Sequence, residues 1–262
     1  MPVKEKTNTP HSKWNLKLLL TIYALVAFFI FTLFCKSTQG FWIPLDTGCF
    51  RILNSWISES VFSQNLWAMA NHRMADWLED FVFLLFFTWI IKATPRERRI
   101  KKSAECLFIL FYAALIHLAF NEALFRGFLH IQRKSPTLIL DSFVDLSEKI
   151  SWIKVKIKSP KSYPGDHATV AILFMAGFLY LARKNFKIIC ASFLYGITLI
   201  LPRLVVGAHW LTDVLFGSVF IVLVPFSLAF CSPFASFVIQ NIEKKICSTL
   251  VWIKCKKRVF LR

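Results

Sequence analysis

Six apolar segments alternate with polar stretches along the chain. Five of them approach or reach the roughly 17–25 residues that a helix needs to cross a bilayer. The remaining segment, 78–91, is short and is expected to extend back through Ala68–Glu79 as an amphipathic helix. Without that extension five spans remain, and the two chain ends fall on opposite sides. The pattern predicts an all-α membrane bundle of about six transmembrane helices. The six segments cover 18–35, 78–91, 104–121, 168–182, 186–202 and 211–231.

Composition supports a lipid environment for these segments. Of 262 residues, 56% are hydrophobic, 16% are aromatic and 18% are charged. An average soluble domain is roughly 45–50% apolar, and a soluble fold of this length could not bury so much apolar surface. The seven cysteines form no CxxC pair, so neither a disulfide framework nor a zinc site is predicted.

Basic residues predict the topology. The formal net charge is +17, and 20 of the 32 Lys and Arg residues fall in 1–17, 92–102, 183–187 and 244–262. Lysine and arginine favour the cytoplasmic side, so both ends are expected there. The expected division is a cytoplasmic arm over 1–16, a six-span domain over 17–231 and a basic cytoplasmic tail over 232–262. The first span is expected to be an uncleaved anchor.

Three polar patches fall outside the membrane in this topology and begin or end apolar spans. In the third patch, His209 and Asp213 stand four residues apart and would share a helix face. A carboxylate there fixes the imidazole tautomer and leaves one nitrogen able to attack. Arg203 precedes them and can fork onto phosphate oxygens. The alternative is an interface histidine capped by a nearby aspartate. The patches are Arg126–Pro136, Tyr163–Ala168 and Pro202–Asp213.

The second patch precedes an apolar helix, for which Asp166 is a plausible N-cap. Free N–H groups at a helix N-terminus suit a phosphate, which would involve Gly165 and Asp166. His167 is placed to protonate a departing oxygen. A capped turn with a surface histidine is the simpler alternative.

The first patch adds cations, namely Arg126, Arg133 and Lys134. Any one of them alone would be read as a contact to lipid headgroups. Together, the three patches supply cations, a nucleophile and an acid, which phosphoryl transfer requires. No carboxylate cluster suited to Mg²⁺ accompanies them.

These patches resemble the signature of the type 2 phosphatidic acid phosphatase superfamily, which has three parts: K-x6-R-P, P-S-G-H and S-R-x5-H-x3-D. The third part keeps its spacing from Arg203 through His209 to Asp213, with Pro where Ser is usual. The second reads P-G-D-H and ends at His167. The first runs from Arg126 to Arg133 with Arg for Lys, and its proline is displaced to position 136.

A closer resemblance is to the lipid A 1-diphosphate synthase branch of that superfamily in Gram-negative bacteria. The likeness runs from about residue 20 to 230. It includes a segment outside the signature, which favours this branch over a general phosphatase. The four segments that carry it are Gly40–Asp46, Arg133–Leu138, Tyr163–His167 and Pro202–Asp213.

The resemblance implies a ping-pong reaction at the periplasmic face of the inner membrane. His209 would take the terminal phosphoryl group of undecaprenyl diphosphate, Asp213 would orient His209, and His167 would protonate the leaving undecaprenyl phosphate. The 1-phosphate of lipid A would then accept the group. The phosphate-binding residues would be the arginines and neighbouring groups, and no metal or organic cofactor is expected. These residues are Arg126, Arg133, Arg203, Lys134, Gly165 and Asp166.

Two alternatives stay open. With water as acceptor, the same site is a lipid phosphatase acting on undecaprenyl diphosphate, lipid A 1-phosphate or a glycerophospholipid phosphate. A non-catalytic transporter is the alternative of another class, since ionisable groups at membrane depth are common in transporters. Nucleic-acid binding is set aside because the positive charge is split between two sides of a membrane.

In the basic stretch Lys149–Lys161, lysines at 154, 156 and 158 alternate with apolar residues, which predicts a cationic face or a solvated loop.

Overall fold

The computed structural model describes residues 13–130 and 133–260, so most of the predicted N-terminal arm lies outside the described residues. Helices are the regular secondary structure of this part of the chain, as the apolar pattern predicts, and no strand occurs among these residues. The longer helices are α1 (Leu16–Phe34), α2 (Lys36–Ser55), α3 (Val61–Ala70), α4 (Arg73–Ala93), α5 (Arg99–Ile116), the π-helical η3 (His117–Phe128), α7 (Asp166–Leu181), α8 (Phe186–Val205), η5 (Asp213–Ser218), α9 (Val219–Phe230) and α10 (Phe234–Phe260).

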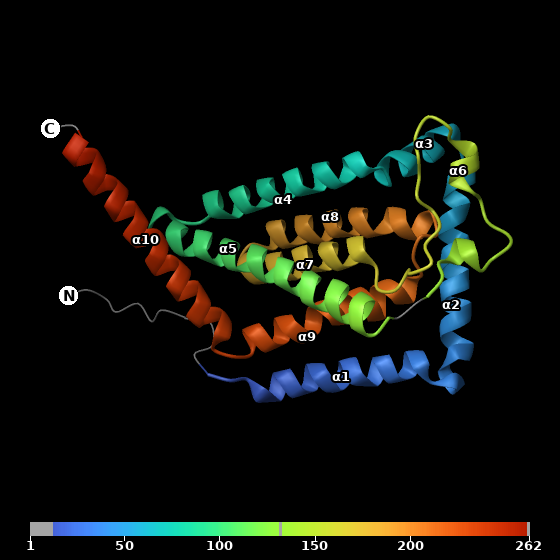
Figure 1. The fold of residues 1–262 in the computed structure, drawn as a ribbon, viewed down its shortest axis with the longest axis horizontal. Helices are drawn as coiled ribbons and strands as arrows, with labels where there is room; N and C mark the ends of the chain where they lie inside the picture. Colours follow the sequence, from blue (N-terminus) through green and yellow to red (C-terminus); the bar gives the residue numbers. More distant parts are fainter. Residues whose placement is uncertain (1–12, 131–132, 261–262) are drawn as a thin grey trace.

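Long helices run side by side, and α2 crosses their ends (Figure 1). These long helices are α1, α4, α5, α7, α8 and α9. Each predicted apolar segment overlaps one of them, although 104–121 continues into η3 and 211–231 also covers η5. By length and composition, four stretches can cross a membrane, while α7 is apolar but shorter. The all-α membrane class is therefore confirmed, whereas the count of six crossings stays a prediction. The four stretches are Leu16–Phe34, Arg96–Phe128, Phe186–Val205 and Asp213–Phe230.

Helix α7 lies at the centre of the bundle and packs against α5, α8 and α9. Phe174 and Phe178 bury their rings there, with centroids 4.7 Å apart. Gly177 permits the close approach of α5, because a Cβ on it would lie 2.7 Å from the Cγ2 atom of Ile109. A packed, largely apolar centre of this kind holds the helix ends at fixed positions.

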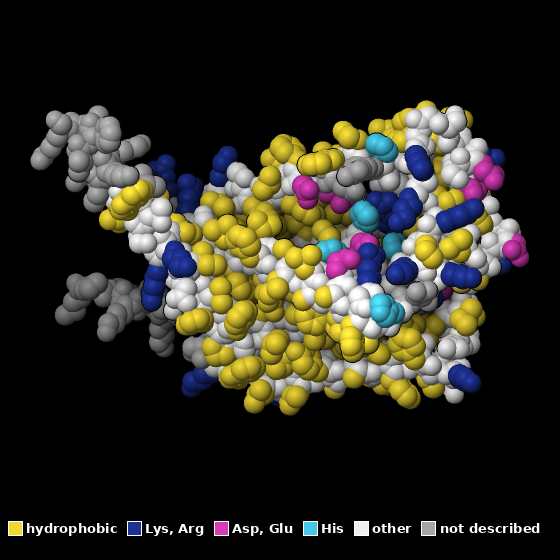
Figure 2. Space-filling model, in the orientation of Figure 1, with side chains coloured by type: hydrophobic (Ala, Val, Ile, Leu, Met, Phe, Trp, Pro, Cys, Tyr) yellow, Lys and Arg dark blue, Asp and Glu magenta, His cyan; other side chains and the backbone are white. Residues whose placement is uncertain are grey.

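Large apolar side chains cover the outside of the bundle. Phe28, Phe111 and Leu118 are each more than half exposed. Figure 2 shows an apolar belt between two ends where charged side chains gather. This distribution suits a bundle whose sides face lipid and whose ends face water.

The two ends of the bundle differ. The start of α1 and helix α10 lie at one end, and α2 and α3 lie at the other (Figure 1). Helix α10 occupies most of the predicted basic tail, and its first half packs on α5 through Ala235 and Ile239. The predicted polar patches all belong to the end away from α10, which is where the candidate site forms.

Candidate active site

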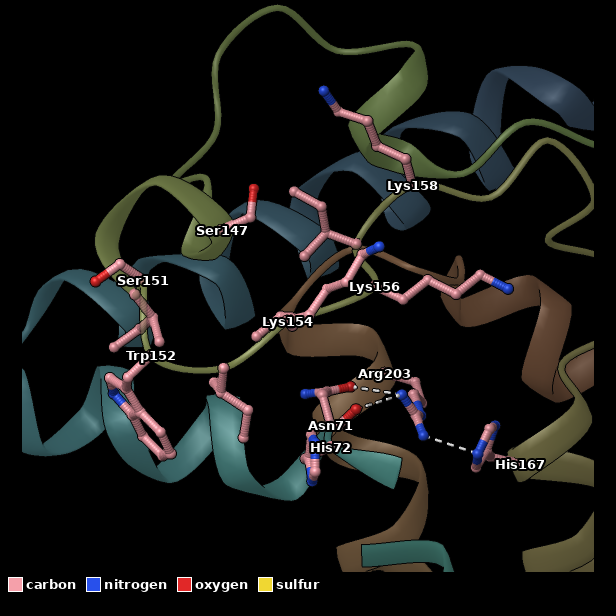
Figure 3. Close-up of a pocket in the computed structure, with 14 residues that line it drawn as sticks. Asn71, His72, Ser147, Ser151, Trp152, Lys154, Lys156, Lys158, His167 and Arg203 are labelled. Atoms are coloured by element: carbon pink, nitrogen blue, oxygen red, sulfur yellow. Dashed lines mark hydrogen bonds between the residues drawn. The ribbon is translucent and has the colours of Figure 1, made fainter. Parts of the chain in front are cut away.

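An open cleft of about 990 Å³ lies at this end of the bundle. One wall carries Asn71, His167 and Arg203, from the α3–α4 junction, the start of α7 and the end of α8. The facing wall is formed by Ser147 and by residues 150–158 of the segment before α7 (Figure 3). The cleft thus joins parts of the second and third predicted patches to the basic loop.

Arg203 bridges two side chains within the cleft. Its Nη2 atom lies 2.7 Å from Nε2 of His167, and its Nη1 atom donates to Oδ1 of Asn71 over 3.1 Å (Figure 3). A guanidinium can only donate, so Nε2 of His167 accepts and this nitrogen carries no proton. Asn71 is buried and also donates to the Pro202 carbonyl, which fixes the α3–α4 junction against α8.

The turn after α8 brings His209 into the protein. Gly207 adopts a φ of +74°, and a Cβ on it would lie 2.5 Å from the Phe50 ring. Both features require glycine here. The Ala208 amide then donates to the Arg203 carbonyl over 3.0 Å, closing the turn. His209, 9% exposed, is consequently held against the loop that precedes α7.

The Ser162 carbonyl, and not Asp213, fixes the tautomer of His209. Nδ1 of His209 lies 2.6 Å from the Ser162 oxygen. A carbonyl only accepts, so Nδ1 carries the proton and Nε2 keeps its lone pair. Burial lowers the pKa of His209 below its ordinary 6.5, although nearby Asp213 opposes the shift. The expected shared helix face of His209 and Asp213 is wrong, because His209 lies in a turn and the π-helical η5 begins at Asp213.

Asp213 instead anchors Arg133. Its Oδ1 accepts from Nη1 of Arg133 over 2.6 Å, and its Oδ2 accepts from the Trp210 amide over 2.8 Å. Nη2 of Arg133 donates to Asp46 over 2.6 Å. Asp46 also accepts from both the amide and the hydroxyl of Thr212. The two carboxylates raise the pKa of Arg133 despite its burial, so the guanidinium stays charged.

A second arginine is also paired with acidic side chains. Arg126 contacts Asp166 and lies 3.2 Å from Glu122. Asn121 donates to Asp166 over 2.7 Å. The predicted N-cap is displaced by one residue: Gly165 occupies that position and α7 begins at Asp166. Asp166 therefore directs its carboxylate at Arg126 instead of capping the helix.

The two other predicted phosphate-binding residues lie close to these groups. A Cβ on Gly165 would lie 3.6 Å from Cγ of His209, so the P-G-D-H segment packs directly on the imidazole. The Lys134 side chain is exposed, while its carbonyl accepts from the Trp210 indole over 2.9 Å. Across the described residues, no three His, Cys, Asp or Glu side chains converge as a metal site would require.

Comparison with known proteins agrees with this geometry. Residues 129–231 match the PAP2 superfamily. The chain carries a PAP2 superfamily domain. It is also 27% identical over 230 residues to the lipid A 1-diphosphate synthase of Escherichia coli (strain K12), covering 87% of this chain and 92% of that protein. No solved structure gives a significant match.

The PAP2 domain and this relative identify a membrane enzyme of the lipid phosphatase and phosphotransferase type. The domain contains His167, Arg203, His209 and Asp213. Two functionally placed groups lie outside it, Asn71 at Arg203 and Asp46 at Arg133. The N-terminal third of the chain therefore completes the surroundings of the PAP2 residues.

Proposed function

We propose that the protein transfers the terminal phosphoryl group of undecaprenyl diphosphate, through a phosphohistidine, to the 1-phosphate of lipid A. The products are undecaprenyl phosphate and lipid A 1-diphosphate. The resemblance to a lipid A 1-diphosphate synthase over most of the chain supports this choice of substrates. No metal or organic cofactor takes part in the proposed reaction.

The proposed first step is attack by Nε2 of His209 on the terminal phosphorus. A P–N bond forms while the bond from phosphorus to the bridging oxygen breaks. Undecaprenyl phosphate departs with that electron pair and takes a proton from His167. In the second step, an oxygen of the lipid A 1-phosphate attacks the same phosphorus, and the P–N electron pair returns to Nε2.

The tautomer of His209 is the observation that carries this proposal. The bond from Nδ1 to the Ser162 carbonyl leaves Nε2 as the nitrogen with a lone pair, and burial keeps the ring neutral at neutral pH. Arg203 and His167 lie together on the cleft wall: Arg203 supplies a cation, and Nε2 of His167 can take up the proton to be donated once the guanidinium turns from it to the phosphate. Asp213 is proposed to hold the loop after Gly207 in place, through its hydrogen bonds with the Trp210 amide and Arg133.

The other predicted phosphate-binding residues have smaller proposed roles; they are Arg126, Arg133, Lys134, Gly165 and Asp166. Arg203 is the arginine proposed to bind the reacting phosphate directly, since it lines the cleft. Arg126 and Arg133 would contact a phosphate while each is already paired with two carboxylates, which offset their positive charge. The amides at the start of α7 remain proposed phosphate donors, as expected at a helix N-terminus.

We also propose the inner membrane as the location, with the cleft in the periplasm and both termini in the cytoplasm. The start of α1 and helix α10 lie at the bundle end opposite the cleft, which supports this orientation (Figure 1). The basic segments 92–102 and 183–187 connect helices at the same end as α10, consistent with a cytoplasmic side.

A radiolabel assay tests the reaction. Undecaprenyl diphosphate labelled in its terminal phosphate is given to purified protein with water and lipid A offered together. Label is expected in lipid A 1-diphosphate, and rapid acid-free quenching is expected to trap labelled protein. His209→Gln should abolish both signals. Label released only as free phosphate would overturn the transferase in favour of a lipid phosphatase, and full turnover by His209→Gln would overturn the nucleophile.

A further inference from the structure

Three lysines form a ledge on the cleft wall that faces Arg203. Lys154, Lys156 and Lys158 are exposed and line the cleft. Figure 3 shows Lys154 and Lys156 above Asn71 and Arg203, and Lys158 further along the same strip with its side chain directed away from Arg203. The lysine ledge thus shares one cavity with His167, although its residues are not part of the proposed chemistry.

The ledge is firmly attached to the protein. Val155 and Ile157, the residues between the lysines, are 7% and 4% exposed. They pack with Val205 and Val206 at the end of α8, next to the turn that carries His209. This alternation confirms the predicted cationic face, although residues 154–158 form neither helix nor strand.

Side-chain hydrogen bonds fix both ends of the ledge. The Thr137 hydroxyl donates to the Ile157 carbonyl over 2.6 Å. At the other end, the Trp152 indole donates to Asn65 on α3 over 3.0 Å. A backbone held in this way presents the three ammonium groups in a constant order, and only their own side chains have to be immobilised when an anion binds.

The charges around the histidines show why the ledge is needed. Among the described groups, Arg126 contacts Asp166 and Glu122, while Arg133 lies between two further aspartates. Two guanidiniums are thus opposed by four carboxylates. A substrate that carries several phosphate charges needs additional cations in the same cavity. The lysine ledge provides them.

The volume of the cleft points to a ligand larger than one phosphoryl group. At about 990 Å³ it lies at the upper end of the roughly 300–1,000 Å³ typical of ligand sites. We propose that the lysine ledge binds a second phosphate of the acceptor lipid, remote from the phosphate that reacts. This inference rests on the proposed function and specifies its acceptor as a lipid with two separate phosphate groups.

The test compares two acceptors in neutral detergent micelles. One is lipid A with two phosphates, and the other is lipid A with only its 1-phosphate. In the triple variant Lys154→Gln/Lys156→Gln/Lys158→Gln, KM for the first acceptor should rise roughly tenfold, because three charge-assisted contacts are lost. KM for the second acceptor and kcat should stay within about twofold. Equal changes for both acceptors, or no change for either, would overturn the proposal.

A matched control uses two lysines of the same loop. Lys149 and Lys161 are exposed and do not line the cleft. Lys149→Gln/Lys161→Gln removes nearby positive charge without touching the ledge, so both acceptors should keep their wild-type KM. If this double variant reproduces the triple variant, the general charge of the loop is responsible and the ledge is not a site.

A further pair of measurements separates the possible sources of the phosphate and the two proposals. If the ledge binds bilayer headgroups, the triple variant will differ from wild type in KM only when phosphatidylglycerol is added to the micelles, and the change will be the same for both acceptors. This outcome overturns the acceptor assignment. The equilibrium affinity for each form of lipid A, measured without donor, tests binding at the ledge independently of phosphoryl transfer. Wild-type protein should bind the bisphosphorylated form more tightly and the triple variant should not, even if no transfer occurs.

Discussion

Arg133 and Arg203 have the same predicted role but different surroundings. Arg133 lies between Asp46 and Asp213, which are 2% and 0% exposed. Arg203 contacts an amide and an imidazole and lines the cleft. A phosphate has to compete with two buried carboxylates at Arg133, whereas at Arg203 these described partners are neutral or titratable. The partners of each arginine therefore distinguish Arg133, which is held by buried carboxylates, from Arg203, the arginine proposed to bind substrate.

The largest expected effect is on stability, at Arg133. Arg133→Met leaves two buried carboxylates without their cation, which should lower the free energy of unfolding by about 3–5 kcal/mol. Thermal unfolding in neutral detergent is the measurement, and Arg203→Met is the matched variant, expected to lose less than Arg133→Met because Asn71 and His167 carry no buried negative charge. Adding Asp46→Asn to Arg133→Met should restore part of the loss. Equal destabilisation by both single variants would break the comparison.

The next effect is on catalysis, at Arg203. Arg203→Met should lower kcat/KM for undecaprenyl diphosphate on the order of 10²–10³-fold, because a charged donor to the reacting phosphate is lost. Release of undecaprenyl phosphate gives the rate, and the unfolding curve of the same sample shows that the fold is intact. Near wild-type turnover in a folded variant would remove Arg203 from the proposed chemistry.

A smaller effect is expected at Asp46, as a positioning residue. Asp46→Asn weakens the hold on Arg133 and Thr212, and hence on the loop that carries His209. A loss of roughly tenfold in kcat with KM unchanged is expected, the size of one weakened charge-assisted bond. Steady-state kinetics with donor varied separates the two constants. A rise in KM alone would assign Asp46 to substrate binding instead.

The smallest effect is on pH dependence. Burial lowers the pKa of His209, and Arg203 adds to that shift. The nucleophile is neutral above its pKa, so the acid limb of kcat/KM should fall below pH 6.5, the ordinary value. In Arg203→Gln that limb should move toward higher pH, measured on the residual activity. An unmoved limb would show that Arg203 does not influence His209.

The sequence alone predicted the helical class. It also predicted that Arg203, His167 and His209 lie at one end of the bundle, because motif spacing and apolar periodicity carry that information. It could not identify Ser162 as the partner of His209, since the acceptor is a backbone carbonyl that any residue supplies. The role given to Asp213 followed from assuming a continuous helix, which the Gly207 turn interrupts.

Asp46 was missed for a different reason. It belongs to a segment whose resemblance was visible, but its partner Arg133 lies 87 residues further along the chain. Their meeting depends on α2 crossing the end of the bundle, a tertiary arrangement that local periodicity does not encode (Figure 1). The alternation at 154–158 was visible because it is local, whereas the cavity it faces was not.

The contact between Arg203 and His167 has a consequence for proton balance. While the guanidinium donates to Nε2, the imidazole cannot also hold a proton there, so the ligand-free enzyme has no acid ready at that atom. A phosphate that draws Arg203 toward itself exposes Nε2, and the ring can then take a proton from solvent. Substrate binding and proton uptake by His167 are thereby coupled, so the imidazole would become an acid only after a diphosphate has bound.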